Sequence, residues 1–200
     1  MIGIVDYEAG NITSVRNALR ATGAEFTVSA EELVLRQCTG IILPGVGAAS
    51  GAIRSLEQRK LLEFLRKLDV PFLGICLGMQ LLYDESEEGE TRCLGIVPGK
   101  VRKLDDRAAR VPHMGWNQVR FTAKNLLNTA VRRRDYFYFA HSYYAPFNTW
   151  TSGLADCGIS FAAAVQKGNY FGVQFHPEKS GAAGLRLLKA FAELCKSFPQ

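Results

Sequence analysis

The sequence around position 76 reads Pro71-Phe72-Leu73-Gly74-Ile75-Cys76-Leu77-Gly78-Met79-Gln80. Pro71–Ile75 has the length and apolar character of a buried strand, and the residues from Leu77 to about Tyr83 have the pattern of a short helix. The cysteine therefore lies where a strand meets a helix. Because one glycine stands two residues before it and another two residues after it, the stretch has the form of a nucleophile elbow. In such an elbow glycines permit a strained turn and a close approach of helix and strand.

A cysteine in this position has two interpretations. At a helix N-terminus the unpaired N–H groups and the partial positive charge favour the thiolate, which is the species that attacks, and the amide of Leu77 is placed to donate to an oxyanion. The alternative is a tight turn that holds a packed thiol, and the motif alone favours that alternative. The chain has five cysteines without a C-x-x-C pair, which fits neither a disulfide framework nor a zinc site, so we expect free thiols at positions 38, 76, 93, 157 and 195.

The order of strand-like and helical patterns changes about half-way along the chain. In the first half, apolar runs of strand length alternate with helical patterns, which is typical of βαβ units around a parallel sheet. After about residue 90, strand-like runs follow one another with little helix between them, which indicates mixed or antiparallel pairing. The expected strands are Ile2–Tyr7, Glu25–Ser29, Gly40–Leu43, Pro71–Ile75, Gly95–Leu104, Gly115–Phe121, Tyr136–Tyr144, Ser160–Gln166 and Tyr170–Phe175. The expected helices are one capped by Asn11 and ended by Gly23, and those at Leu61–Leu68, Leu77–Tyr83 and Gly184–Lys196.

These elements predict an α/β fold. We expect a mostly parallel, twisted central sheet with helices on both faces, plus a smaller antiparallel or mixed sheet. Ser160–Gln166 and Tyr170–Phe175 are expected to form a hairpin through the glycine-containing loop Lys167-Gly168-Asn169. With 200 residues and 48% hydrophobic content the chain can bury one sizeable core, so we expect a single domain over residues 1–200.

Composition narrows the classes of function. The net charge of +5 is modest and no RNA- or DNA-binding motif accompanies it, so we expect no nucleic acid partner. The densest basic run, Arg132-Arg133-Arg134, is either a solvated loop, which is the favoured interpretation, or a docking surface for an acidic partner. No apolar run reaches the roughly 18 residues of a membrane span. Because no basic segment or cleavage site precedes Ile2-Gly3-Ile4-Val5, we expect a cytosolic protein that has no membrane partner.

A catalytic thiol needs a base, and the base needs an orienting group. The chain has three histidines, His113, His141 and His176. His176 and Glu178 stand two residues apart in Gln174-Phe175-His176-Pro177-Glu178, so in an extended backbone both side chains project to the same side. Glu178 would accept a hydrogen bond from one ring nitrogen of His176 and leave the other facing the thiol. A surface His and Glu near a strand end is the alternative, which is favoured until the pair is considered together with the elbow.

A third motif, Leu43-Pro44-Gly45-Val46-Gly47, stands at the end of the strand expected at Gly40–Leu43. Open α/β sheets place their active sites at such strand ends. Because glycine reaches positive φ at little steric cost, Gly45 and Gly47 would let the Val46 peptide turn its N–H toward a substrate. A simple βα turn would use the same residues, and the motif alone does not separate the two interpretations.

Taken together, these motifs resemble those of a known family. Residues 74–80 (GICLGMQ) and 176–178 (HPE) are similar to the two signatures of the class I, triad-type glutamine amidotransferases. Four further motifs resemble the glutaminase subunits of imidazole glycerol phosphate synthase: residues 44–47 (PGVG), 112–117 (PHMGWN), 137–144 (FYFAHSYY) and 175–181 (FHPEKSG). The resemblance runs from residues 6–11 (DYEAGN) to the last helix and so covers essentially the whole chain.

The resemblance implies a Cys–His–Glu triad that hydrolyses glutamine. Cys76 would attack the carboxamide, and His176, oriented by Glu178, would protonate the departing ammonia and then activate water against the thioester. The residues implied to hold the oxyanion or the substrate are Gly45, Val46, Gly47, Leu77, Gln80, Ser142 and Tyr143. No metal or organic cofactor is implied.

The resemblance also implies a partner. The family pairs this subunit with a cyclase, a (β/α)₈ barrel, which uses the ammonia to make imidazole glycerol phosphate and an aminoimidazole carboxamide ribonucleotide in histidine biosynthesis. Glutaminase activity in the family is weak until the cyclase binds its own substrate. The positions that match the subunit interface are Asn11, Trp116, Asn117 and Lys179. For Trp116, a buried core aromatic is an equally good interpretation.

Three alternatives remain open at this point. The chain could serve another synthase, such as one for anthranilate, aminodeoxychorismate or sugar modification, but such subunits are not expected to carry both PHMGWN and FYFAHSYY. A hydrolase that does not use glutamine would have no reason to keep the PGVG strand and a docking face. A catalytically inactive binding subunit would not need an intact Cys76, His176 and Glu178.

Overall fold

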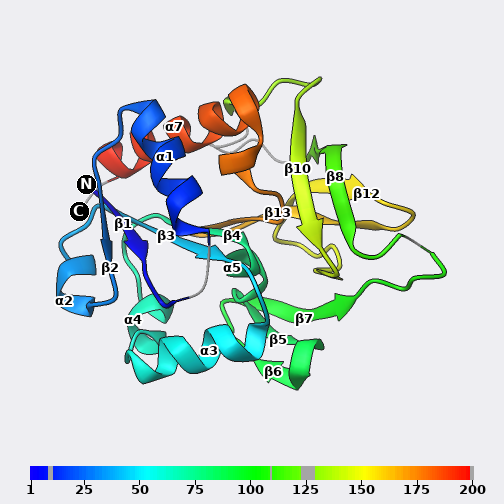
Figure 1. Cartoon of the computed structure of the whole chain (residues 1–200), viewed down its shortest axis with the longest axis horizontal. Helices are drawn as coiled ribbons and strands as arrows, with labels where there is room; N and C mark the ends of the chain where they lie inside the picture. The colour runs from blue at the N-terminus through cyan, green and yellow to red at the C-terminus, as the bar shows by residue number, and fades with distance from the viewer. Residues whose placement is uncertain (9–10, 109, 123–128, 199–200) are drawn as a thin grey trace.

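The computed structural model describes residues 1–8, 11–108, 110–122 and 129–198, and its largest element is an eight-stranded sheet (Figure 1). The strand order is β2-β1-β3-β4-β14-β13-β12-β9. In that order the bounds are Phe26–Ser29, Ile2–Val5, Gly40–Gly45, Phe72–Cys76, Tyr170–Val173, Ser160–Lys167, Thr151–Asp156 and Arg120–Phe121.

The five strands from β2 to β14 are parallel, and the last three pair antiparallel. β1, β3, β4 and β14 are buried along their whole length, as expected of parallel strands that are covered on both faces. Since the carboxyl ends of parallel strands meet at one edge of a sheet, the segments that follow these four strands converge there.

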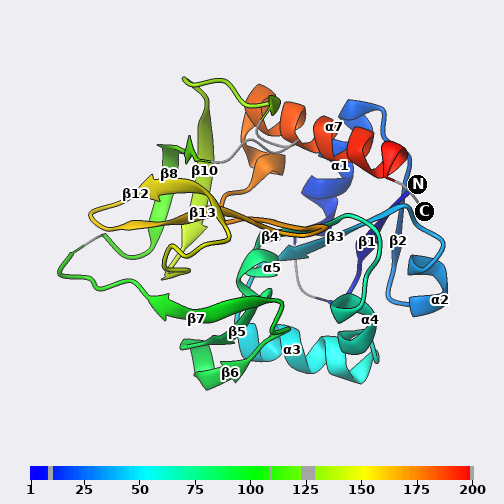
Figure 2. The same cartoon turned by 180° about the vertical axis from the view of Figure 1, so that it is seen from behind.

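Helices cover both faces of this sheet (Figures 1 and 2). α1 (Ile12–Thr22) and α7 (Gly181–Ser197) lie together on one face, while α3 (Ala49–Gln58) and α4 (Leu62–Arg66) lie on the other. The short helix α2 (Glu32–Leu35) follows β2, and α5 (Leu77–Gln80) begins at the carboxyl end of β4. α1 has the expected caps, because Asn11 accepts a hydrogen bond from the Ser14 amide and Gly23 adopts the left-handed conformation that ends a helix.

Two smaller sheets complete the fold. One has the order β11-β7-β5-β6, with bounds Tyr143–Tyr144, Val97–Lys103, Tyr83–Ser86 and Thr91–Arg92, and it mixes parallel and antiparallel pairs. The other is the antiparallel ribbon of β8 (His113–Gln118) and β10 (Tyr136–His141), which lies at the end of the molecule far from both termini (Figures 1 and 2). Two 3₁₀ turns, η1 (Glu88–Glu90) and η2 (Pro177–Lys179), lie in the connections. The predicted α/β architecture is therefore confirmed.

Several element boundaries differ from those expected. The helix predicted at Leu77–Tyr83 ends at Gln80, because Tyr83 begins β5 and is buried as a strand residue of the mixed sheet. The run Tyr136–Tyr144 divides into β10 and β11, which belong to different sheets. The expected hairpin forms between β13 and β14, but Lys167 pairs with Tyr170, so its loop has two residues instead of three.

Five elements were not predicted from the sequence: α2, α3, β12 and the short strands β5 and β6 of the mixed sheet. α3 buries Ala49, Ala52 and Leu56, and its alanines give a weak periodic signal. β12 contains Gly153, which weakens a strand pattern. A Cβ on this glycine would lie 2.9 Å from a Val119 methyl, so the residue serves close packing in the sheet.

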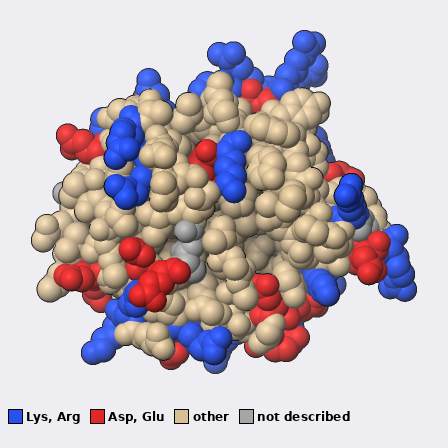
Figure 3. All heavy atoms as spheres, viewed as in Figure 1, with Lys and Arg blue, Asp and Glu red and all other residues tan. Residues whose placement is uncertain are grey.

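Charged side chains are dispersed over the face seen in Figure 3, where Lys and Arg are scattered among Asp and Glu with no continuous basic stripe. Arg132, Arg133 and Arg134 are exposed, as the favoured solvated-loop interpretation expects. Among the described residues, no helix is both long enough and apolar enough to cross a membrane.

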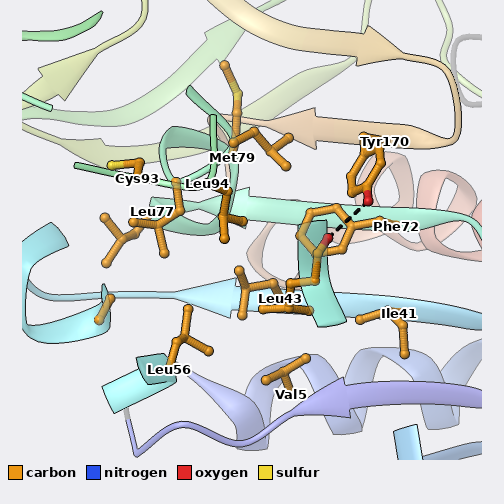
Figure 4. Packing of buried hydrophobic residues seen from close by; sticks show 14 of the residues in the cluster. Val5, Ile41, Leu43, Leu56, Phe72, Leu77, Met79, Cys93, Leu94 and Tyr170 are labelled. Carbon is orange, nitrogen blue, oxygen red and sulfur yellow. Dashed lines mark hydrogen bonds between the residues drawn. The ribbon is translucent and has the colours of Figure 1, made fainter. Parts of the chain in front are cut away.

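The connection from β4 into α5 is closely packed. Leu43, Phe72, Leu77 and Met79 belong to one buried cluster, whose packing Figure 4 shows. A Cβ on Gly78 would overlap the backbone carbonyl oxygen of Leu43. α5 can therefore lie directly against β3 only because this position has no side chain.

We predict that Gly78→Ala will lower the free energy of unfolding by more than about 3 kcal/mol, at the upper end of overpacking costs, because the obstacle is backbone and cannot rotate away. Gly51→Ala is the matched control: Gly51 lies in α3 with nothing within 4 Å of its would-be Cβ. That change should be neutral or stabilise by up to about 1 kcal/mol. Urea unfolding of both variants measures the difference, and similar stabilities would contradict the close-approach argument.

Candidate active site

Cys76 occupies the predicted elbow. It is the N-cap of α5 and has φ of 53° and ψ of −107°, a conformation that costs a non-glycine residue about 1–3 kcal/mol. The packing of Gly74 and Gly78 against each other and against β3 holds the turn in this state. Only 6% of Cys76 is exposed, and the peptide N–H of Leu77 next to it is one of the helix N-terminal donors that have no intrahelical partner.

His176 and Glu178 reach this cysteine because β14 is parallel to β4. Val173 pairs with Ile75, so the residues that follow β14 lie beside Cys76. The ring Nδ1 of His176 is 2.8 Å from Glu178 Oε1, and both side chains are buried. The pair forms across the 3₁₀ turn η2, and not along an extended strand as expected, because Pro177 begins a turn there.

Electrostatics favour a charged histidine in this site. Burial lowers the pKa of His176, but its hydrogen bonds with Cys76 and Glu178 outweigh burial and raise that pKa above its usual value. Within the described residues, Glu178 Oε2 has no hydrogen-bond partner, so the carboxylate bonds through Oε1 to His176. The arrangement is that of a thiolate–imidazolium pair with an orienting carboxylate.

A cavity of about 390 Å³ opens over Cys76. Its lining includes two members of the triad, Cys76 and His176, while Glu178 lies behind the histidine. Six residues predicted to hold the oxyanion or the substrate also line it: Val46, Gly47, Leu77, Gln80, Ser142 and Tyr143. The seventh, Gly45, does not line the cavity.

The two glycines beside Val46 have different roles. Gly47 has a φ of 90°, as predicted, and Val46 is 41% exposed at the cavity. Gly45 belongs to β3, and the prediction of a positive φ there is wrong. A Cβ at Gly45 would lie 2.6 Å from the amide nitrogen of Gly78, so the close approach of α5 explains this glycine. Buried Tyr7 donates a hydrogen bond of 2.8 Å to the Pro44 carbonyl and so restrains the same segment.

Comparison with known proteins agrees with this geometry. A family model described as Glutamine amidotransferase class-I matches residues 3–194. The chain belongs to the class I glutamine amidotransferase family. The predicted resemblance to this family is thus confirmed, and the chain is a class I glutamine amidotransferase.

Relatives of this amidotransferase include subunits of one synthase. It is 45% identical over 192 residues to the imidazole glycerol phosphate synthase subunit HisH of Idiomarina loihiensis, with 96% of each chain covered. The HisH subunit of Escherichia coli (strain K12) is also 45% identical over 192 residues, covering 96% of this chain and 98% of that one.

Solved structures share the amidotransferase fold at lower identity. The crystal structure of a glutamine amidotransferase has a TM-score of 0.73 and 17% identity, covering 98% of this chain and 98% of that one. The structure of PurLQS from Thermotoga maritima has a TM-score of 0.73 and 18% identity, covering 96% of this chain and 97% of that one. These likenesses bear on the fold alone.

The four positions predicted for a subunit interface differ in their exposure and in their contacts. Trp116 is 57% exposed on β8 and meets Tyr138 edge-on, so the alternative of a core aromatic is wrong. Lys179 lies at the cavity with its amine 5.9 Å from the Tyr138 ring. Asn11 caps α1, and Asn117 turns inward to donate to the Asp156 carbonyl at 2.7 Å. A contact of these residues with a partner stays a prediction.

Two residues of the site, Glu88 and Gln174, were not predicted from the sequence. Glu88 lines the cavity, and its carboxylate also accepts a hydrogen bond of 2.8 Å from the Ala49 amide at the start of α3. Gln174 is fully buried, and its amide nitrogen is 3.6 Å from the Cys76 sulfur. The motif Q-x-H-P-E contained the signal for Gln174, since it places the glutamine next to the base, but an isolated acidic residue such as Glu88 carries no signal.

Two further histidines lie at the substrate cavity: His141 lines it, and His113 contacts His141. His141 Nδ1 is 2.9 Å from the Tyr143 carbonyl, and His141 Nε2 is 2.9 Å from Nδ1 of His113. Burial, and secondarily the neighbouring His113, lower the pKa of His141 to about 3, and burial lowers that of His113 as well. His141 is therefore neutral in the folded protein at neutral pH.

We predict that this buried neutral histidine makes the protein less stable in mild acid. The pKa of His141 rises from about 3 when folded to about 6.5 when unfolded, so the unfolded chain binds the extra proton as pH falls below about 6.5. Between pH 7 and pH 5 the wild type should lose about 2 kcal/mol more unfolding free energy than His141→Asn.

The asparagine variant keeps an N–H donor near the position of Nδ1 but does not titrate, and the other groups cancel in the difference, including His176 with its raised pKa. Urea unfolding at the two pH values gives the result. Equal losses in both proteins would mean that His141 is not held neutral.

Proposed function

We propose that this chain is the glutaminase subunit of an imidazole glycerol phosphate synthase, that residues 1–200 form its single glutaminase domain, and that it works in the cytoplasm. One observation carries the chemistry: Cys76 stands on a strained elbow beside the hydrogen-bonded pair of His176 and Glu178, at a cavity of about 390 Å³. That volume falls in the range of small-molecule sites. The cysteines of the described residues are all free, which fits a reducing compartment.

The reaction follows from these groups. The Cys76 thiolate attacks the carboxamide carbon of glutamine, so that a C–S bond forms and the carbonyl oxygen takes the negative charge. The His176 imidazolium then protonates the nitrogen, the C–N bond breaks, and ammonia leaves a γ-glutamyl thioester. His176 next takes a proton from water, whose oxygen attacks the thioester, and cleavage of the C–S bond gives glutamate and restores the thiolate.

The developing oxyanion needs N–H donors, and two sources lie at the cavity. The Leu77 amide at the start of α5 is one, and the Val46 peptide, which the neighbouring Gly47 leaves free to turn, is the other. Gln80, Ser142 and Tyr143 line the same cavity and take the remainder of the substrate. The Glu88 carboxylate is placed to attract the α-ammonium of glutamine.

A partner must use the ammonia. The HisH relatives are subunits of a synthase, which supports a cyclase partner, a (β/α)₈ barrel. Exposed Met114 and Trp116 lie on the same face of β8, where residues alternate between exposed and partly buried. Exposed apolar side chains next to the site are typical of a surface that binds another protein. The interface roles of Asn11, Trp116, Asn117 and Lys179 are part of this proposal.

We predict that Cys76→Ala and Cys76→Ser will abolish ammonia release from glutamine, because no thioester can form without the thiolate. Ammonia is measured in a coupled assay with the cyclase present. As a control, Cys157→Ala replaces a half-buried thiol outside the cavity lining and should keep full activity. Substantial glutaminase activity in the Cys76 variants would overturn the assignment of the nucleophile.

We also predict that an imidazole glycerol phosphate cyclase with its ribonucleotide will bind the chain and strongly raise glutamine turnover. Calorimetry measures binding, and ammonia release measures turnover. Trp116→Ala should weaken binding by about 1 kcal/mol or more, as loss of an exposed aromatic at an interface does. Failure to bind this cyclase, with binding to an anthranilate or aminodeoxychorismate synthase instead, would identify a different partner.

A further inference from the structure

The sulfur of Cys76 has a polar neighbour outside the triad. Because β14 pairs with β4 in parallel, Gln174 lies next to Cys76 at the carboxyl edge, and its amide nitrogen is 3.6 Å from the sulfur. The Ala140 carbonyl oxygen is 3.8 Å from the sulfur and accepts a hydrogen bond from it when the thiol is protonated. A carbonyl so close disfavours the thiolate, whereas an amide N–H favours it.

The amide of Gln174 could present either its nitrogen or its oxygen to the sulfur, and its neighbours decide which. The Gln80 amide nitrogen is 2.9 Å from the Tyr143 carbonyl and 3.0 Å from Gln174 Oε1. A backbone carbonyl can only accept, so Gln80 must turn its NH₂ group toward Tyr143 and toward Gln174. Gln174 must then offer its oxygen to Gln80 and its N–H to the sulfur.

The Tyr143 carbonyl also accepts a hydrogen bond from His141, which is in turn paired with His113. His141 donates from Nδ1 to this carbonyl, so its neutral Nε2 accepts from Nδ1 of His113. Nε2 of His113 in turn accepts from the Asn117 amide at 3.3 Å. Each donor in this chain meets an acceptor only while both histidines are neutral. A proton on His141 would set two N–H groups against each other.

We propose that Gln174 is a catalytic residue of the Cys76 chemistry, which donates a hydrogen bond to the thiolate, and that His141 is a positioning residue that fixes this donor through the Tyr143 carbonyl and Gln80. The fixed donor offsets the Ala140 carbonyl and leaves His176 free to transfer its proton. This assignment deepens the proposed function, but it concerns the state of the sulfur and does not require glutamine as the substrate.

The test measures the thiolate directly. In the full-length protein, the rate at which iodoacetamide alkylates Cys76 is followed by mass spectrometry of the Cys76 peptide between pH 5 and pH 10. Gln174→Leu should move the midpoint of this profile upward by about one pH unit and slow alkylation below the midpoint about tenfold, as expected when one weak charge-assisted hydrogen bond is lost. A midpoint equal to that of the wild type would overturn the proposal.

Gln166→Leu is the matched control, since Gln166 lies on β13 and its side chain bonds only the Gly168 carbonyl among the described contacts. Its profile should equal that of the wild type. If Gln174→Leu does not fold, Gln174→Glu decides: it keeps the oxygen that accepts from Gln80 and sets a second oxygen against the sulfur. The midpoint should then rise by more than one pH unit, and an unchanged midpoint refutes the role of Gln174.

A second pair of variants tests the positioning role. His141→Asn keeps a donor for the Tyr143 carbonyl and should retain the wild-type midpoint, whereas His141→Phe removes it and should raise the midpoint part of the way toward that of Gln174→Leu. A purely structural role would change stability in both variants without moving the midpoint. With glutamine, Gln174→Leu should lower kcat and leave KM unchanged. Wild-type protein without glutaminase activity would refute the proposed function and leave the alkylation result valid.

Discussion

The contact between Gly78 and the Leu43 carbonyl is the constraint on which the site depends. Because no side chain separates α5 from β3, the chain must reverse within one residue after β4, and Cys76 takes the positive φ that this reversal requires. The cost of that conformation is offset by the buried apolar cluster around Leu77 and Met79. The reactive sulfur is therefore positioned by core packing and not by a flexible loop.

The second requirement is the parallel pairing of β14 with β4. The two strands are almost a hundred residues apart in sequence, yet their register sets two polar neighbours of the sulfur, the base His176 and the amide of Gln174. η2 then turns the chain so that Glu178 lies behind the histidine. The pairing of these two strands thus places beside Cys76 the side chains that interact with its sulfur.

Much of this arrangement could be predicted from local sequence. The elbow, the His–Glu pair and the glycine next to Val46 follow from spacing and from the limits of glycine and proline, and the family and the α/β architecture were predicted and confirmed. Local sequence could not show that the run Tyr136–Tyr144 changes sheets near Ser142, nor that Gly45 is required by a neighbouring helix. Nor could it show the hydrogen bonds that connect His113, His141 and Gln80, because these residues come together only through pairing of strands far apart in sequence.

The alternation of side chains along β8 has an evolutionary consequence. Met114 and Trp116 face outward, while His113 and Asn117 face the protein interior, because successive residues of a strand project to opposite sides. A substitution at Trp116 changes the outer surface and leaves the hydrogen-bonded inner positions in place. One six-residue strand therefore holds two sets of positions that can change independently of each other.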